Sequence, residues 1–227
     1  MAERYARNKE LIGAHEQALL REKTLAVVGL GGLGGHIAEQ LARLGVGHLI
    51  LIDADSVEAS NLNRQLFATE QTLGLPKTQA ATIRLAQVDA TVKLTTHQTR
   101  LTPQNGKELL RGADIVFDAV DNIHSRLALE ELCDGLQVPL VHGSIGGWWG
   151  QVSVVFPGQR TLSRIYPHPD AQGAEKRYGN PAFTPAVVAS IQTAEALKLC
   201  LGRDETTLRG KLLRIDLLEH EYMVIDV

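Results

Sequence analysis

The chain has 227 residues, of which 44% are hydrophobic, and a formal net charge of −3 at pH 7. This size suits one sizeable α/β domain, and we expect a single domain over residues 1–227. Basic residues are scattered and the pI is about 6.2, which argues against nucleic-acid and membrane-surface partners. The chain begins MAERYARNKELIG, without the apolar stretch of a signal peptide, and has no run of about 18 apolar residues, so we expect a cytoplasmic protein.

Helical and strand patterns alternate over the first 150 residues. An N-terminal helix is predicted over about 7–22, forming an arm (1–22) ahead of a nucleotide-binding core (23–150). In the core, apolar β-rich runs lie at about 24–30, 47–53, 92–97, 114–119 and 139–144, and helical patterns at about 32–44, 76–88, 103–111 and 123–136. This alternation predicts an α/β fold with a Rossmann-like, doubly wound, mainly parallel sheet.

The pattern changes in the remaining part of the chain, 151–227, which we expect to add antiparallel strands to the sheet. The segment QVSVVFP predicts one strand, and LLRIDLLEHEYMVIDV predicts two strands joined by a short polar turn. Between them, residues 157–183 are polar and long for a connector, and loops of this length tend to be functional or disordered.

A helix is predicted between that loop and the last two strands. Thr184 is expected to cap its N-terminus, Pro185 to take the first helical position, and Gly202 to end it.

The segment LAVVGLGGLGGHIAEQ contains a glycine pattern typical of nucleotide sites. Gly29, Gly31 and Gly34 fit G-x-G-x-x-G between a predicted strand and helix, and Asp53 follows about 20 residues later. Such glycines allow a tight turn and let backbone N–H groups approach phosphate at a helix N-terminus. The pattern predicts a nucleotide without specifying which one.

Further polar residues follow the second predicted strand. Asn61, Asn63, Arg64 and Gln65 crowd the loop there, which a dinucleotide site does not require and which suits a triphosphate. Lys77, in GLPK, begins a helix, where a cation opposes the helix dipole and is better explained by a bound phosphate than by chance.

Acidic residues mark the end of the fourth predicted strand. In VFDAVDN, Asp118, Asp121 and Asn122 lie where the carboxyl edge of the sheet is expected, which is the ligand edge of open α/β folds. A carboxylate at this edge can carry Mg²⁺.

The two cysteines, Cys133 and Cys200, do not form a C-x-x-C pair, which excludes a zinc tetrathiolate. Both lie in predicted helices and are expected to pack in the core. The eight histidines lack metal-ligand spacing, and we interpret them as structural or surface residues.

Taken together and in order, these motifs resemble the ThiF/MoeB/HesA family, the bacterial relatives of ubiquitin-activating enzymes. The resemblance spans nearly the whole chain and includes RYARN, GLGGLG, DADSVEASNLNRQ, GLPK, DAVDN, VPLVHGSIGGWWGQV and TAEALKL. It implies an ATP-dependent adenylyltransferase, commonly a homodimer, acting on the C-terminal glycine carboxylate of a ubiquitin-like sulfur carrier protein ending in Gly-Gly. The implied pathway is thiamine or molybdopterin/tungstopterin-type cofactor biosynthesis.

The resemblance also implies roles for individual residues, each at a position matching a family motif. The glycines form the phosphate-side loop, Asp53 takes the ribose hydroxyls, and Asp121 is associated with Mg²⁺. Arg7 is implied to be an arginine donated to the neighbouring subunit's site. The residues implied to bind the polyphosphate are Asn61, Arg64 and Lys77.

The sequence departs from the family in three respects. Many members hold a structural zinc through two C-x-x-C pairs, some carry a cysteine in the loop matching 157–183, and some have a rhodanese domain, and none of these features is found here. We therefore expect no zinc and no covalent sulfur transfer on this chain. The role of the chain would end at the acyl-adenylate, which a separate sulfur donor attacks.

Three alternatives remain. A tRNA-modifying, ATP-dependent dehydratase relative shares the same core, although it should show a basic face. An NAD-linked oxidoreductase would explain the glycines and Asp53 but would leave Arg64, Lys77 and Asp121 without roles. A non-catalytic binding module would not need these charged site residues.

Overall fold

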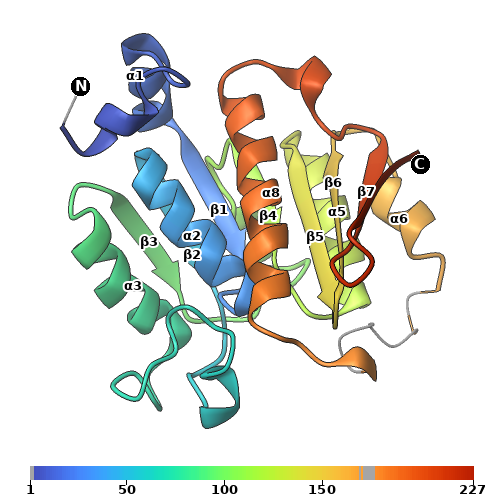
Figure 1. Cartoon of the computed structure of the whole chain (residues 1–227), viewed down its shortest axis with the longest axis horizontal. Helices are drawn as coiled ribbons and strands as arrows, with labels where there is room; N and C mark the ends of the chain where they lie inside the picture. The colour runs from blue at the N-terminus through green and yellow to red at the C-terminus, as the bar shows by residue number, and fades with distance from the viewer. Residues whose placement is uncertain (1–2, 169, 171–176) are drawn as a thin grey trace.

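The computed structural model describes residues 3–168, 170 and 177–227 (Figure 1). Its strands form one mixed sheet in the order β3-β2-β1-β4-β5-β6-β7-β8. The parallel strands are β1 (Thr24–Val28), β2 (His48–Ile52), β3 (Lys93–His97), β4 (Ile115–Asp118) and β5 (Leu140–Gly146). The antiparallel strands are β6 (Trp149–Val155), β7 (Lys211–Asp216) and β8 (Glu221–Asp226). The expected Rossmann-like sheet with antiparallel C-terminal strands is confirmed.

The central strands are apolar because both of their faces are covered. In β1, Leu25 and Val27 belong to the core on one face, whereas Ala26 and Val28 belong to the core on the other. Strands buried on both faces are near-continuous runs of apolar residues, which is the pattern in the sequence TLAVV.

Helices cover the two faces of the sheet (Figure 1). One face carries α2 (Gly32–Leu44), α3 (Lys77–Val88) and α8 (Phe183–Cys200), and α2 packs against α8. The other face carries α4 (Gly106–Leu109), α5 (Ile123–Leu136) and α6 (Thr161–Ile165). The 3₁₀ helices η2 (Ala59–Asn61) and η3 (Asp204–Thr206) lie in connections.

The N-terminal arm differs from the single helix predicted over 7–22. It contains a 3₁₀ helix, η1 (Glu3–Asn8), and a separate helix, α1 (Ala14–Glu22). Gly13, in an extended conformation, lies between them as the N-cap of α1. Its N–H donates to Glu16 Oε2 at 3.0 Å. Tyr5 fixes η1 to the body of the protein through a 2.5 Å hydrogen bond from its hydroxyl to Asp89 Oδ2.

Two other predicted helices have different bounds. The helix expected over 103–111 is only the short α4. The prediction that Thr184 caps α8 is wrong: the helix begins at Phe183, and the Thr184 hydroxyl donates to the carbonyl of Gly147 at 2.6 Å. Pro185 is therefore the third helical residue, which the helix tolerates because first-turn N–H groups have no intrahelical acceptor.

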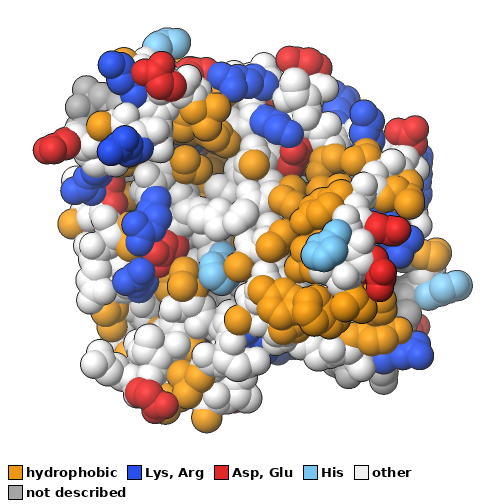
Figure 2. Space-filling view, in the orientation of Figure 1, with side chains coloured by type: hydrophobic (Ala, Val, Ile, Leu, Met, Phe, Trp, Pro, Cys, Tyr) orange, Lys and Arg blue, Asp and Glu red, His pale blue; other side chains and the backbone are white. Residues whose placement is uncertain are grey.

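At one edge of the sheet, β8 pairs with β7 and with no other strand of the described residues. Its residues Tyr222, Met223 and Val224 are each more than half exposed. Figure 2 shows hydrophobic side chains gathered on the side of the molecule that carries the last strands. None of the described helices has the length and apolarity that a membrane span requires.

Candidate active site

A cavity of about 440 Å³ opens at the carboxyl ends of β1, β2 and β4. The strand order reverses between β1 and β4, since β2 and β3 lie on one side of β1 and the later strands on the other. Open α/β sheets bind ligands at this switch point, and the volume lies in the range of roughly 300–1,000 Å³ usual for small-molecule sites. The candidate residues that line the cavity are Gly29, Gly31, Asp53, Asn61, Arg64, Gln65, Lys77, Asp121 and Asn122.

The glycine loop joins β1 to α2 at one wall of the cavity. Gly29 has φ +92°, and a Cβ there would lie 2.5 Å from the Ala119 carbonyl oxygen, so both conformation and space require glycine. Gly31 is the N-cap of α2, whose first N–H groups have no intrahelical acceptor and can bind an anion. Gly34 does not line the cavity. A Cβ on Gly34 would lie 1.8 Å from the Gly29 carbonyl oxygen, so it lets α2 pack directly on the loop.

Asp53 follows β2 and links two backbone segments. Its carboxylate accepts from Leu30 N at 2.6 Å and from Asp55 N at 2.8 Å. Burial raises the pKa of Asp53, although the Lys77 ammonium and the two N–H groups act in the opposite direction. A buried acceptor fixed in this way suits the predicted hydrogen bonds to ribose hydroxyls.

Lys77 is the first residue of α3 and is buried. Its Nζ lies 2.9 Å from Asp55 Oδ2 and 4.0 Å from Asp53 Oδ2. Asp55 is mostly exposed, so its carboxylate can turn into solvent when another anion binds Lys77. The lysine is thus placed to exchange a carboxylate for a phosphate.

The loop after β2 brings Asn61 and Arg64 to the same cavity. Asn61 ends η2, is buried, and accepts from Glu58 N at 3.1 Å through Oδ1. Arg64 Nη1 donates to Ser60 O and to Asn63 Oδ1, both at 2.9 Å. A backbone carbonyl and a side-chain amide of the same loop thus hold the Arg64 guanidinium at the wall of the cavity.

Asp121 lies in the turn between β4 and α5, across the cavity mouth. It is exposed, and its Oδ1 accepts from Asn122 Nδ2 at 3.2 Å. Asn122 also caps α5 by accepting from Ser125 N at 2.9 Å. One helix cap thereby orients the predicted magnesium carboxylate.

Residues 5–227 match the family model described as "ThiF family". The chain belongs to the ThiF family. "Adenylyltransferase and sulfurtransferase MOCS3" from Culex quinquefasciatus is 37% identical over 219 residues, which cover 94% of this chain and 50% of that protein. "Sulfur carrier protein adenylyltransferase" from Thermus thermophilus is 36% identical over 99% of this chain and 87% of that protein. The chain thus spans about half the length of its MOCS3 relatives and most of the Thermus relative.

Solved structures of other proteins share the fold. E. coli MccB with ATP matches with a TM-score of 0.81 and 21% identity, over all of this chain and 72% of MccB. E. coli tRNA N6-threonylcarbamoyladenosine dehydratase, TcdA, with ATP matches with a TM-score of 0.76 and 24% identity, over 89% of this chain and 95% of TcdA. At these identities, the matches establish the fold of this ThiF-family chain.

Arg7 lies away from the cavity of its own chain. It is exposed on η1, which Tyr5 fixes to Asp89, the residue that follows α3. The cavity lies at the other end of α3, at Lys77, and 12 helical residues span about 18 Å. An Arg7 that acts in ThiF-family chemistry must therefore do so from another chain or after moving.

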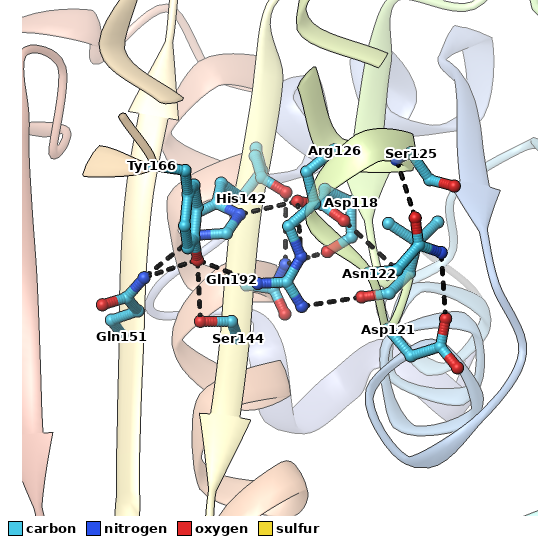
Figure 3. A network of polar contacts seen from close by, with 12 residues as sticks. Asp118, Asp121, Asn122, Ser125, Arg126, His142, Ser144, Gln151, Tyr166 and Gln192 are labelled. Carbon is cyan, nitrogen blue, oxygen red and sulfur yellow. Dashed lines mark hydrogen bonds and ion pairs between the residues drawn. The ribbon is translucent and has the colours of Figure 1, made fainter. Parts of the chain in front are cut away.

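Sequence reasoning missed a polar network beneath the cavity, which Figure 3 shows in close-up. Asp118, expected at the ligand edge, is fully buried and does not line the cavity. His142 Nδ1 lies 2.6 Å from its Oδ2, and Arg126 Nε lies 3.9 Å from the same atom. Burial lowers the pKa of His142, despite the opposing effect of Asp118. Asp118 is therefore a structural acceptor here.

The donor set fits one mode of metal binding. Among the described residues, no group of three or more His, Cys, Asp and Glu side chains could hold a metal ion. Mg²⁺ is commonly held by one or two carboxylates together with substrate phosphates. A single carboxylate ligand from the protein, Asp121, is compatible with this mode of binding.

Proposed function

We propose that this chain transfers AMP from ATP to the C-terminal glycine carboxylate of a ubiquitin-like sulfur carrier protein ending in Gly-Gly, releasing pyrophosphate. The observation that carries the proposal is the convergence of Arg64, Lys77 and the α2 N-terminus on one cavity, with Asp121 across it. The substrate class is supported by the names of two relatives. One is the Thermus adenylyltransferase, of which this chain covers 87%. The other is the "SAMP-activating enzyme E1" of Haloferax volcanii, which is 32% identical over 98% of this chain and 84% of that protein.

The site residues suit attack of a carboxylate on the α-phosphorus of ATP. The attacking carboxylate is already ionised at pH 7, so the step needs no general base. It brings two anions together and expels a third, so positioning and positive charge provide most of the acceleration. Arg64, Lys77 and Asn61 would bind the phosphates, Asp53 would accept from the ribose hydroxyls, and the loop at Gly31 would supply N–H donors.

Mg²⁺ would be held at Asp121, where it would neutralise charge on the phosphates. Asn122, which donates to that carboxylate, would keep it directed toward the cavity.

In this proposal the chain itself stops at the acyl-adenylate, and a separate sulfur donor completes thiolation in thiamine or molybdopterin/tungstopterin-type biosynthesis. Both cysteines are free and buried, and burial raises the pKa of Cys200 to about 12. A thiol with such a pKa is a poor nucleophile at neutral pH.

The experiment is ATP–pyrophosphate exchange with a carrier protein ending in Gly-Gly. Adenylation is reversible, so labelled pyrophosphate should return to ATP. Lys77→Ala and Arg64→Ala should each lower exchange roughly a hundredfold or more, because each removes a charge-assisted contact to phosphate in the transition state. Lys107→Ala, on the exposed side of α4, is the matched control and should leave exchange unchanged.

The alternatives predict different outcomes in the same assay. Reduction of NAD(P)⁺ without exchange would point to an oxidoreductase. ATP turnover that depends on tRNA and not on any carrier would point to the dehydratase relative. Near-normal exchange in both site variants would leave Lys77 and Arg64 without a role in adenylation.

A further inference from the structure

The hydroxyl of Tyr166 joins a distant segment of the chain to the floor of the site (Figure 3). Tyr166 directly follows α6, in a stretch that we call the α6 segment (residues 157–168). Its hydroxyl accepts from Arg126 Nη1 at 2.8 Å and from Gln151 Nε2 at 2.7 Å. His142 Nε2 and Ser144 Oγ each lie 3.1 Å from the same oxygen. The oxygen therefore uses both of its acceptor sites and has two candidate acceptors for its proton.

Five residues form a closed ring of hydrogen bonds around the turn between β4 and α5. From Tyr166 the ring passes to Arg126, whose Nη2 donates to the Val120 carbonyl at 2.8 Å. Val120 N donates to Asp118 Oδ1 at 3.1 Å, and Asp118 Oδ2 pairs with His142 Nδ1 at 2.6 Å. His142 Nε2 returns the ring to the Tyr166 hydroxyl at 3.1 Å.

The protonation of the ring is self-consistent. With His142 neutral, its Nδ1–H donates to the Asp118 carboxylate and its Nε2 accepts from Tyr166. Each bond then has one donor and one acceptor, and buried networks that are satisfied in this way hold their members in a single arrangement.

The ring holds the residue immediately before Asp121. Both the N–H and the carbonyl of Val120 are bound within it, and Asn122 fixes Asp121 from the other side. All members of the ring except Tyr166 belong to β4, β5, α5 or the turn itself. The ring is therefore closed by the α6 segment.

The α6 segment is attached to α5 by contacts that do not involve Tyr166. Glu130 on α5 already holds that segment by accepting from Leu162 N at 2.6 Å, Ser163 N at 3.2 Å and Ser163 Oγ at 2.8 Å. The Tyr166 hydroxyl instead bonds to residues of α5, β5 and β6, and Arg126 connects it to the turn beside the cavity through the Val120 carbonyl.

We propose that Tyr166 is a positioning residue, which acts through Arg126 and Val120 to set the β4–α5 turn and thereby the direction of Asp121. The catalytic consequence rests on the proposed function, whereas the effect on the turn does not.

The test is Tyr166→Phe, which removes only the hydroxyl oxygen. The aromatic ring keeps its edge-on contact with His142 and its place under the Arg126 guanidinium. In the free protein, hydrogen exchange measured by mass spectrometry should accelerate about five- to tenfold in peptides covering 119–126, as expected for the loss of about one net hydrogen bond. In ATP–pyrophosphate exchange, kcat should fall about tenfold while KM for ATP stays within twofold, and the Mg²⁺ concentration for half-maximal activity should rise.

Tyr222→Phe, on the exposed β8 strand, is the matched control and should change neither measurement. Should Tyr166→Phe not melt cooperatively, Arg126→Lys takes its place, because it removes the guanidinium fork that joins Tyr166 to Val120. Faster hydrogen exchange confined to peptides covering 158–166, with kcat unchanged, would show that Tyr166 only anchors the α6 segment. That result would overturn the proposal. If the wild-type protein adenylates no carrier, the proposed function fails. Hydrogen exchange in peptides covering 119–126 still decides whether the hydrogen-bond ring positions the turn.

Discussion

Lys77 has an anionic partner before any nucleotide binds, because Asp55 lies 2.9 Å from its ammonium. An unpaired ammonium buried to this degree would be costly, so the pair keeps the free site stable. A bound phosphate would replace Asp55, and the lysine would remain paired in both states. In the proposed function, the contribution of Lys77 to nucleotide affinity is then the difference in free energy between its ion pair with phosphate and its ion pair with Asp55.

At the same scale, we predict that the double variant Cys133→Ala/Cys200→Ala keeps full adenylation activity. Both thiols are buried in helices, and burial raises the pKa of each, so neither is a thiolate at neutral pH. The measurement is ATP–pyrophosphate exchange together with a melting curve. A variant that melts cooperatively but no longer adenylates the carrier would show that one of the cysteines acts chemically.

The sequence predicts the residues that line the cavity better than those that support them. Gly29, Asp53 and Lys77 can be predicted because each sits at a fixed position relative to a strand or helix end. Tyr166 belongs to no motif, and His142, although it lies within VPLVHGSIGGWWGQV, is 24 residues away from it. Their contact exists only because β5 and the α6 segment meet in the folded chain, and local patterns carry no information about such pairing.

At the scale of elements, carboxylates on α5 hold the α6 segment in place. Glu130 accepts from the first turn of α6, and Asp134 Oδ1 accepts from Gly158 N at 2.6 Å. These two carboxylates attach the α6 segment to α5.

We therefore predict that Glu130→Ala lowers the free energy of unfolding by about 2 kcal/mol, since it leaves the buried Leu162 N–H and the partly buried Ser163 N–H without their acceptor. Glu131→Ala, one residue further along α5 and exposed, is the control and should change stability little. Urea denaturation measures the free energy of unfolding of both variants.

We also predict that the purified protein holds no stoichiometric zinc and that EDTA leaves its melting temperature unchanged. One zinc per chain in elemental analysis would contradict this.

The order of the elements was predicted correctly, whereas some of their ends were not. The apolar runs predict the parallel strands of the core, because strands buried on both faces are nearly continuous runs of apolar residues. The arm was predicted as one helix, because its helical residues outweigh the single Gly13 that interrupts them. Thr184 has the chemistry of a cap, but its hydroxyl found a tertiary acceptor at Gly147.

At the scale of the whole molecule, the position of Arg7 predicts a site shared between two chains of a homodimer. Arg7→Ala and Asp121→Ala should each be nearly inactive alone, and mixing them one to one with subunit exchange should make about half of the dimers mixed. If Arg7 acts in trans, one site in each mixed dimer carries both substitutions and the other carries neither. About a quarter of all sites would then be intact, so activity should recover to roughly a quarter of wild type.

If Arg7 acts within its own chain, every site in the mixture keeps one substitution and nothing recovers. Native mass spectrometry must confirm that mixed dimers are present. Confirmed mixed dimers with no gain in exchange over either parent would rule out the shared site.

The exposed edge strand β8 has a consequence for self-association. An edge strand can pair with an identical strand from another copy, and a two-fold antiparallel pairing of β8 would align its first residue with its last. Glu221 would then face Asp226 at both ends of the ladder, while Met223 would face Val224 in the middle. Like charges placed directly opposite each other are destabilising. The strand therefore resists growth of the sheet from one molecule into the next, even though its central side chains are apolar and exposed.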